Sequence, residues 1–340
     1  MRVLTVNAGS TSLKVAAVVD GAAAPRVASL DDALAGAPPD AIAHRVVHGG
    51  DRTAPVLVDE RVMDELLALA DLAPLHQPPA LDALTTCRAA WPAVPNVACF
   101  DTAFHSTIPA AARTYALPAR WRDTVKVYGF HGLSCAWAAG RVAAMAPDVR
   151  RLVVAHLGGG QSLTAVLDGR SVLTTMGFTP LDGLVMATRC GSLDPGAVLW
   201  LQRHGVDDLE RVLEHDSGLL GLCGTADMRE VHARADAGDT DAQSAFDVWC
   251  HRVRTNLGAC VAALEGLDAL VFTGGVGEHD RRARAAIATD FHWLGVDIAD
   301  GPDDGDDREI TAPGAAVRTF VIEAREDLQL AAEATALLRG

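Results

Sequence analysis

The sequence predicts an α/β protein with mixed sheets, divided into two related domains. Short apolar runs alternate along the chain with segments of helical periodicity, a pattern typical of layered α/β folds. A hairpin-like pattern with a glycine-containing loop occurs near the N-terminus and again near the middle. The chain has 340 residues, of which 49% are hydrophobic, so each of two domains can bury a core of its own.

The repeated pattern consists of a strand, a loop of small or polar residues, a second strand and an Asp-Gly turn. The two copies occupy Arg2–Val6, Asn7–Ser12, Leu13–Val19 and Asp20-Gly21, and then Leu152–Ala155, His156–Gln161, Ser162–Leu167 and Asp168-Gly169. Ser12-Leu13 aligns with Ser162-Leu163 if one residue is inserted. Because repeats indicate duplicated architecture, we expect two domains that each begin with a strand, a phosphate-sized loop and a strand. The alternative is that two unrelated hairpins share these few identities.

The remaining elements follow from apolar spacing. Val62, Leu66 and Leu69 recur at helical spacing in the first half. In the second half, one long helix carries a single apolar stripe made of Phe246, Trp249, Val253, Leu257, Cys260 and Leu264, which we interpret as core. The expected helices are Glu60–Leu72, Pro79–Trp91, Thr240–Leu264 and Asp327–Leu338, and the further expected strands are Val94–Phe100, Ala269–Thr273 and Val317–Ile322.

Composition excludes several classes of protein. The formal net charge of −15 disfavours general nucleic-acid binding, because the phosphate backbone would be repelled. No apolar run is long enough to cross a membrane, and the N-terminus does not read as a secretory signal. The seven cysteines include no CxxC pair, which favours reduced thiols in the cytoplasm without a disulfide or a zinc site. The acidic stretch from Asp300 to Asp307 is expected to be a mobile loop without a function.

Four glycine-containing loops are each expected to follow a short apolar strand. They are Asn7–Ser12, His156–Gly160, Gly221–Thr225 and Gly274–Gly277. Glycine lets backbone N–H groups approach an anion closely, so such loops suit phosphates, although any one of them could be an ordinary turn. The absence of a Walker A sequence, and of a GxGxxG that opens a helix, disfavours a P-loop NTPase and a dinucleotide enzyme.

Several charged residues occur in unusual apolar or glycine-rich surroundings. Arg45, His131 and Arg189 are each flanked by apolar residues or glycine, which is unlike a solvated surface. Arginine suits bidentate binding of a carboxylate or phosphate. Asp101 at a strand end and Glu326 at the start of the last helix could hold Mg²⁺. The alternatives are structural ion pairs, a core histidine and, for Glu326, an N-terminal helix charge.

In combination, these motifs resemble those of the acetate kinase family, in family order and over nearly the whole chain. The first signature resembles Val6–Lys14 and the second Gly129–Ser134. The further matches are His44–Gly50, Ala73–His76, Phe100–His105, Met176–Leu181, Ser217–Gly221 and Gly275–Glu278.

The resemblance implies two duplicated ribonuclease-H-like domains of the sugar kinase, Hsp70 and actin superfamily, with an interdomain nucleotide cleft. The expected domains are residues 1–106 with 327–340, and residues 107–326. The resemblance also implies reversible, direct in-line phosphoryl transfer between ATP and acetate or propionate, with Mg²⁺ (or Mn²⁺) as cofactor and a homodimeric assembly. A carboxylate is already an adequate nucleophile, so catalysis would consist of positioning and charge neutralisation.

The resemblance also assigns roles to individual residues. Asp101, His131 and Arg189 would be catalytic, Arg45 would hold the substrate carboxylate, and Val47, Leu75, Phe130 and Pro180 would form the alkyl pocket. Asn7 and Glu326 would bind the metal. The nucleotide would contact Lys14, His156, Leu157, Gly158, Gly159, Gly160, Asp227, Met228, Arg229, Gly275, Val276, Gly277, Glu278 and His279.

Some positions depart from the family pattern. Leu133, Cys135, His279 and Arg325 replace usual residues, and the stretch between Lys14 and Arg45 is short. None of these changes removes a residue assigned to the chemical step, although they could retune the acyl site or the nucleotide preference. A butyrate or branched-chain acyl kinase is therefore an alternative function, and a non-catalytic sensor is a more distant one.

Overall fold

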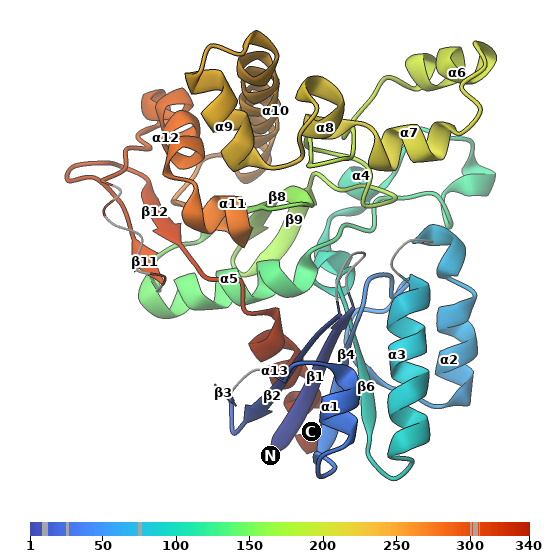
Figure 1. The fold of residues 1–340 in the computed structure, drawn as a ribbon. Coiled ribbons are helices and arrows are strands. Elements are labelled where there is room, and N and C mark those ends of the chain that lie inside the picture. The colour runs from blue at the N-terminus through green and yellow to red at the C-terminus, as the bar shows by residue number, and fades with distance from the viewer. Residues whose placement is uncertain (9–12, 25–26, 74–76, 300, 302–304, 306) are drawn as a thin grey trace. The chain divides into compact units, whose positions relative to one another are not determined.

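The computed structural model describes residues 1–8, 13–24, 27–73, 77–299, 301, 305 and 307–340, and the chain divides into two compact units (Figure 1). Unit 1 comprises Met1–Thr107, Tyr128–Trp137 and Ala324–Gly340, and unit 2 comprises Ile108–Val127 and Ala138–Glu323. The expected division at 107 and 327 differs, because residues 128–137 and 324–326 lie with unit 1. The Gly132 amide donates to the Asp101 carbonyl (2.9 Å), and Leu133 packs into the core of unit 1.

Unit 1 is a six-stranded sheet in the order β3-β2-β1-β4-β6-β5. Its central strands β1, β4 and β6 are parallel, whereas β2, β3 and β5 pair antiparallel. The strands are β1 Arg2–Ala8, β2 Leu13–Val19, β3 Ala22–Ala23, β4 Ala41–Val46, β5 Val56–Leu57 and β6 Asn96–Phe100. The helices that lie wholly in this unit are α1 Leu30–Leu34, α2 Glu60–Leu67, η1 Ala70–Leu72, α3 Gln77–Ala90, η2 Ala103–Thr107 and α13 Glu326–Arg339, and α5 Gly132–Met145 begins in it.

Alternating side chains of this sheet pack against different helices, as the two-residue period of a strand requires. Val3 and Ala43 pack with Leu330 of α13 on one face. Leu4 and Ile42 belong to a separate cluster with residues of α1 and α3. The sheet of unit 1 is therefore covered on both faces, with α13 on one side and α1 and α3 on the other (Figure 1).

Unit 2 repeats this topology. Its sheet has the order β11-β12-β10-β7-β8-β9, with β7, β10 and β12 parallel and the others antiparallel. The strands are β7 Arg151–Leu157, β8 Gln161–Leu167, β9 Arg170–Thr174, β10 Ala269–Thr273, β11 Arg308–Glu309 and β12 Arg318–Val321. The helices are α4 Ala110–Arg113, η3 Ala119–Trp121, α6 Pro195–Arg203, α7 Leu209–His215, α8 Gly218–Cys223, α9 Met228–Asp236, α10 Thr240–Leu264, α11 Gly274–His279, α12 Arg281–Asp290 and η4 His292–Leu294.

The two sheets have the same strand order, which confirms the duplication. The pairing of β1 with β2 and of β7 with β8 corrects the expected alignment of the two hairpins. Leu13 pairs with Ala8 in unit 1, and Gln161 pairs with Leu157 in unit 2. Leu13 therefore corresponds to Gln161 rather than to Leu163, because the longer loop is the one in unit 1. Ser12 lies outside the described residues.

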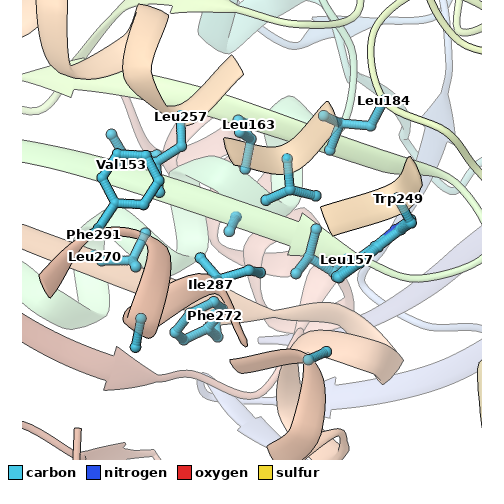
Figure 2. Close-up of a cluster of buried hydrophobic side chains, with 14 of the residues drawn as sticks. Val153, Leu157, Leu163, Leu184, Trp249, Leu257, Leu270, Phe272, Ile287 and Phe291 are labelled. Atoms are coloured by element: carbon cyan, nitrogen blue, oxygen red, sulfur yellow. The ribbon is translucent and has the colours of Figure 1, made fainter. Parts of the chain in front are cut away.

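The core of unit 2 is built around α10, whose bounds are those expected. The predicted stripe from Phe246 to Leu264 is buried throughout, and Trp249 also donates from Nε1 to the Gln161 Oε1 atom (2.9 Å). Figure 2 shows Trp249 and Leu257 of this helix among side chains of β7, β8, β10 and α12. The stripe is therefore core, as its spacing predicts.

Two expected elements are corrected by local hydrogen bonds. The helix expected over Glu60–Leu72 ends at Leu67 and continues as η1, and the Gln77 side chain donates to the Leu66 carbonyl in the last turn of α2 (3.2 Å). Gly221 does not follow a strand: it lies within α8, which ends on the left-handed Gly224. Within the acidic stretch, Asp307 accepts from Arg141 Nε (2.6 Å) and from the Glu323 amide (2.9 Å), so this residue has a structural role.

Candidate active site

In unit 1, the carboxyl ends of the parallel strands bring polar side chains together. Asn7 of β1 is in register with Arg45 of β4, and Asp101 follows the end of β6. Lys14 of β2 pairs directly with Asn7 in the antiparallel ladder, so both side chains leave the same face of the sheet. Residues far apart in sequence thus meet at one sheet edge. We call Asn7, Arg45, Asp101 and Glu326 the unit 1 cluster.

Arg45 is the hub of the unit 1 cluster. Its Nε atom donates to both carboxylate oxygens of Asp101 (3.2 and 3.1 Å), and Nη2 donates to Asp101 Oδ2 (2.6 Å). Its Nη1 atom donates to Asn7 Oδ1 (3.2 Å). These bonds use one hydrogen from each of the three nitrogens, so Nη1 and Nη2 each have a second N–H group. Guanidinium N–H groups of this kind can bind another carboxylate or a phosphate.

Glu326 completes the cluster from the first residue of α13. Its Oε2 atom accepts from Asn7 Nδ2 (2.6 Å), which joins the first strand to the last helix. No group of three or more His, Cys, Asp or Glu side chains among the described residues could hold a metal ion. Mg²⁺ typically takes one or two protein oxygens and completes its shell with phosphates and water, so the neighbouring Asn7 and Glu326 fit that ion.

The charges of the cluster support one another despite their burial. Burial raises the pKa of Asp101, and the Arg45 guanidinium opposes that shift. For Arg45, burial by itself would lower the pKa, but the carboxylates of Asp101 and Glu326 raise it above its ordinary value. Arg45 therefore stays charged, and its bidentate pairing favours an ionised Asp101.

His131 lies next to the cluster in a strained conformation. Its φ is +60°, a left-handed value that few residues other than glycine adopt. The following Gly132 has no room for a side chain, since a Cβ atom there would lie 2.1 Å from the Asp101 carbonyl oxygen. The His131 carbonyl accepts from the Cys135 amide within the first turn of α5 (2.9 Å). The start of α5 thus ties His131 to the peptide of Asp101.

Two other histidines of unit 1 are structural, which agrees with the alternative that histidines in these motifs belong to the core. His44 Nε2 contacts Asn96 Oδ1 (2.8 Å), and His105 Nε2 donates to the Phe130 carbonyl (2.8 Å). Burial lowers the pKa of each to about 4, so both are neutral at pH 7.

The expected alkyl-pocket residues are described in part. Val47 and Phe130 are buried in unit 1, where the His48 ring contacts both Tyr128 (centroids 4.4 Å apart) and Phe130 (5.8 Å). Pro180 belongs to unit 2. Leu75 lies outside the described residues.

Unit 2 contains a cavity of about 930 Å³, which we call the unit 2 cavity. The volume suits a nucleotide-sized ligand. Eight residues expected at the nucleotide line it: Gly158, Gly159, Asp227, Met228, Arg229, Gly275, Val276 and His279. The other expected residues of the glycine loops do not line it; Leu157 and Gly277, for example, are buried in the fold.

Two glycine segments form one wall of this cavity. Gly274 has φ +77°, and a Cβ atom there would lie 2.7 Å from the Leu157 carbonyl oxygen. Its amide donates to Glu278 Oε1 (2.8 Å), which caps the start of α11. A Cβ on Gly158 would lie only 3.8 Å from the Gly275 amide nitrogen, so the two loops lie against each other. The wall therefore consists of backbone, as close approach to phosphate requires.

Sequence reasoning missed seven residues that also line the cavity, namely Gln161, Ala187, Leu219, Ala226, His232, Asp280 and Arg281. His232 follows Met228 by one helical turn on α9, so helical spacing would have placed both on one face. No local pattern marks Ala187 or Leu219, which reach the cavity only through the fold.

Arg189 lies elsewhere in unit 2. Its Nη1 atom donates to the Pro180 carbonyl (3.0 Å), and its Nε atom lies 3.6 Å from a Glu214 carboxylate oxygen. Burial raises the pKa of Glu214, and the Arg189 charge opposes that shift. Arg189, expected to be catalytic, and Pro180, expected in the alkyl pocket, are therefore neighbours.

The four residues that depart from the family pattern have different surroundings. Leu133 and Cys135 are fully buried, His279 is largely exposed at the cavity, and Arg325 forms a bidentate pair with Asp327 (2.9 and 2.7 Å). None of the seven cysteines forms a disulfide. Among the described helices, none is both long and apolar enough to span a bilayer.

Comparison with known proteins relates both units to one family. The model of the acetokinase family matches residues 36–332. An acetate kinase from Clavibacter sepedonicus is 44% identical over 311 residues, which cover 88% of this chain and 78% of that protein. A propionate kinase from Francisella tularensis subsp. tularensis SCHU S4 has a TM-score of 0.88 at 33% identity, with 98% of each chain covered. An acetate kinase from Entamoeba histolytica has a TM-score of 0.91 at 28% identity, with 100% of each chain covered.

Proposed function

The chain belongs to the acetokinase family, and we propose that it catalyses reversible phosphoryl transfer between ATP and acetate or propionate. The observation that supports this proposal is the arrangement of Arg45, whose guanidinium is held by Asp101 and Asn7 and has further N–H groups that can bind a carboxylate. Acetate and propionate are the substrates named for the similar acetate and propionate kinases.

In this proposal, Asp101 orients Arg45 and does not act as a base. A carboxylate substrate needs no deprotonation to attack phosphorus, and both Asp101 oxygens already accept from Arg45. Arg45 binds and aligns the substrate carboxylate. His131 and Arg189 neutralise charge on the transferred phosphoryl group. The left-handed backbone of His131 and the bond from Arg189 to the Pro180 carbonyl support a fixed position for each residue.

The unit 2 cavity binds ATP or ADP. Its wall of Gly158, Gly159 and Gly275 suits the phosphates, and Met228 and Val276 supply apolar surface for the base. Asn7 and Glu326 would hold Mg²⁺, with Mn²⁺ as a possible substitute, and Lys14 shares their sheet face. When bound, the metal ion supplies positive charge that neutralises the phosphates of the nucleotide.

The test is an initial-rate assay with ATP, Mg²⁺ and unbranched carboxylic acids of one to five carbons. We expect the highest kcat/KM with acetate or propionate, and formation of ATP from the acyl phosphate and ADP in the reverse assay. A preference for butyrate or a branched acid would overturn the substrate assignment. Absence of turnover with every acid would overturn the enzymatic proposal and favour a non-catalytic role.

Assembly and location complete the proposal. We place the protein in the cytoplasm as a homodimer, for which the absence of disulfides and the exposed apolar Leu199 and Trp200 on α6 are supporting features. Light scattering should therefore give twice the chain mass of 35.6 kDa.

A further inference from the structure

The cavity wall formed by α11 needs support from outside the helix. α11 has six residues and starts directly at the end of β10, and its residues Gly275, Val276 and His279 line the unit 2 cavity. So short a helix is not stable by its own hydrogen bonds, because nucleation costs more than one or two turns return. At the end of α11, the Asp280 amide donates to the Val276 carbonyl (2.9 Å). The carbonyls that follow lie beyond the reach of the helix's own amides and must be bonded from outside it.

Arg284 of α12 supplies partners for these carbonyls. Its side chain is fully buried, and Nη1 donates to the Gly277 carbonyl (2.8 Å) and to the Glu278 carbonyl (2.6 Å). A buried guanidinium is costly unless it is bonded, so its presence here indicates a specific task. Arg284 does not line the cavity, and any effect it has on a ligand passes through α11.

A second link holds the junction of α11 and α12. Asp280 caps α12 by accepting from the Ala283 amide (2.9 Å), and its other oxygen accepts from His232 Nε2 (2.7 Å). His232 belongs to α9, which begins at Met228, another residue of the cavity. The His232 ring is itself fixed edge-on against Phe246, with centroids 4.8 Å apart. This link thus connects α9 to the junction of α11 and α12, and all three helices contribute residues to the cavity.

We propose that Arg284 is a positioning residue for nucleotide binding, acting through the Gly277 and Glu278 carbonyls to hold the Gly275–His279 segment in its binding conformation. The His232–Asp280 pair supports the same junction from the side of α9. The inference rests on the proposed function only for the assignment of a nucleotide to the unit 2 cavity.

The experiment measures the Kd of ADP by calorimetry, together with the KM values of ATP and acetate. Arg284→Met should raise the Kd of ADP and the KM of ATP by about tenfold or more, while the KM of acetate changes by less than about twofold. Arg284→Lys should recover part of the affinity, because an ammonium can still donate to a carbonyl. The matched controls are Arg252→Met and Arg252→Lys, at an exposed arginine of α10 in the same unit.

Melting temperatures show which variants are folded. If Arg284→Met does not fold, Arg284→Lys decides, and Asp280→Asn, which keeps a capping side chain but weakens the bond to His232, should raise the Kd of ADP by about threefold. Folded Arg284 variants with the ADP affinity of the Arg252 controls would overturn the inference, as would an equal rise in the KM of acetate. Wild-type protein that binds ADP but phosphorylates no acid would refute the proposed function and leave the Arg284 comparison valid.

Discussion

Single side chains in this protein act largely through their neighbours. Asp101 accepts from Arg45 with both oxygens, and Asn7 bridges Arg45 and Glu326 with the two ends of one amide. The donors in this series of hydrogen bonds are therefore oriented before any ligand binds. Such preorganisation costs nothing at the moment of reaction, which is why it lowers a barrier effectively.

In the proposed mechanism Arg189 neutralises charge on the transferred phosphoryl group, so Arg189→Ala should lower kcat by at least about 10²-fold. The melting temperature should change little, since the side chain of Arg189 contacts a loop carbonyl, a largely buried carboxylate and one buried core atom, the Met186 sulfur (3.6 Å). Arg189→Lys should restore little activity, because a point charge cannot reproduce a planar fork. Near-normal turnover of Arg189→Ala would remove this residue from the chemical step.

Glu326→Gln should raise the Mg²⁺ concentration for half-maximal rate much more than the KM of acetate. The amide retains the size of the side chain and an oxygen toward Asn7, but it removes the charge that would attract the proposed metal ion. Rates measured across a Mg²⁺ titration provide the check, and Glu323→Gln is a control at an exposed carboxylate three residues earlier in the sequence. Unchanged metal dependence would leave Glu326 as an N-terminal charge of α13.

At the scale of elements, the polar residues of the unit 1 cluster lie near the carboxyl ends of the strands, and a buried histidine lies next to them on β4. Asn7 and Arg45 share one level of the parallel ladder, so a shift of one residue would turn one of them to the opposite face. His44 precedes Arg45 on β4 and points to the other side, where it is buried. Alternation along a single strand thus separates a site residue from a structural one.

The free energy of unfolding should fall as the pH decreases from about 7 towards 4. His44 and His105 have folded pKa values of about 4, whereas unfolded histidine has an ordinary value of 6.5. Between pH 7 and 4 the unfolded chain binds more protons than the folded chain. Each histidine therefore lowers the free energy of unfolding by up to about 1.4 kcal/mol for every unit by which the pH falls.

Urea unfolding at pH 7, 6 and 5 measures this slope. His44→Gln, which keeps a donor for Asn96 but cannot be protonated, should flatten it, whereas His251→Gln on the exposed side of α10 should not. Equal slopes in wild type and His44→Gln would show that His44 does not contribute.

At the scale of the whole molecule, the two units carry the same sheet topology with different side chains at matching levels. Asn7 of β1 corresponds to His156 of β7, each being the second-to-last residue of its strand. Arg45 of β4 corresponds to Thr273 of β10, since Arg45 pairs with Asn7 and Thr273 pairs with His156. Duplication therefore supplied two similar frameworks, of which one acquired the Arg45 cluster and the other a cavity.

Val47→Ala should shift the preference of the enzyme towards longer acids and leave the KM of ATP unchanged. Val47 is almost fully buried in unit 1, as is Phe130. One more methylene in an apolar pocket is worth about 0.8 kcal/mol where it fits, and overpacking costs about 1–3 kcal/mol where it does not. For the wild type, kcat/KM should differ by only a few-fold between acetate and propionate. It should be at least about tenfold lower for butyrate or valerate.

The check is kcat/KM across the acid series for both proteins. A wild-type preference for butyrate would show that the alkyl pocket is not formed by these residues, and the buried Leu133 and Cys135 would be the next positions to vary. An unchanged order of acids in Val47→Ala would remove Val47 from the pocket.

The sequence by itself determined the class of fold, the duplication, the long helix α10 and most strands, because these depend on residue spacing along the chain. Local patterns identified Arg45, Asp101 and Glu326 as candidates, and the family resemblance added Asn7. Only the tertiary structure decided how they pair, since the register of β1 with β4 and the position of α13 depend on contacts distant in sequence. It also decided that His232 lines the unit 2 cavity and that Arg284 supports its wall, because no spacing or motif encodes a bond from one helix to the carbonyls of another.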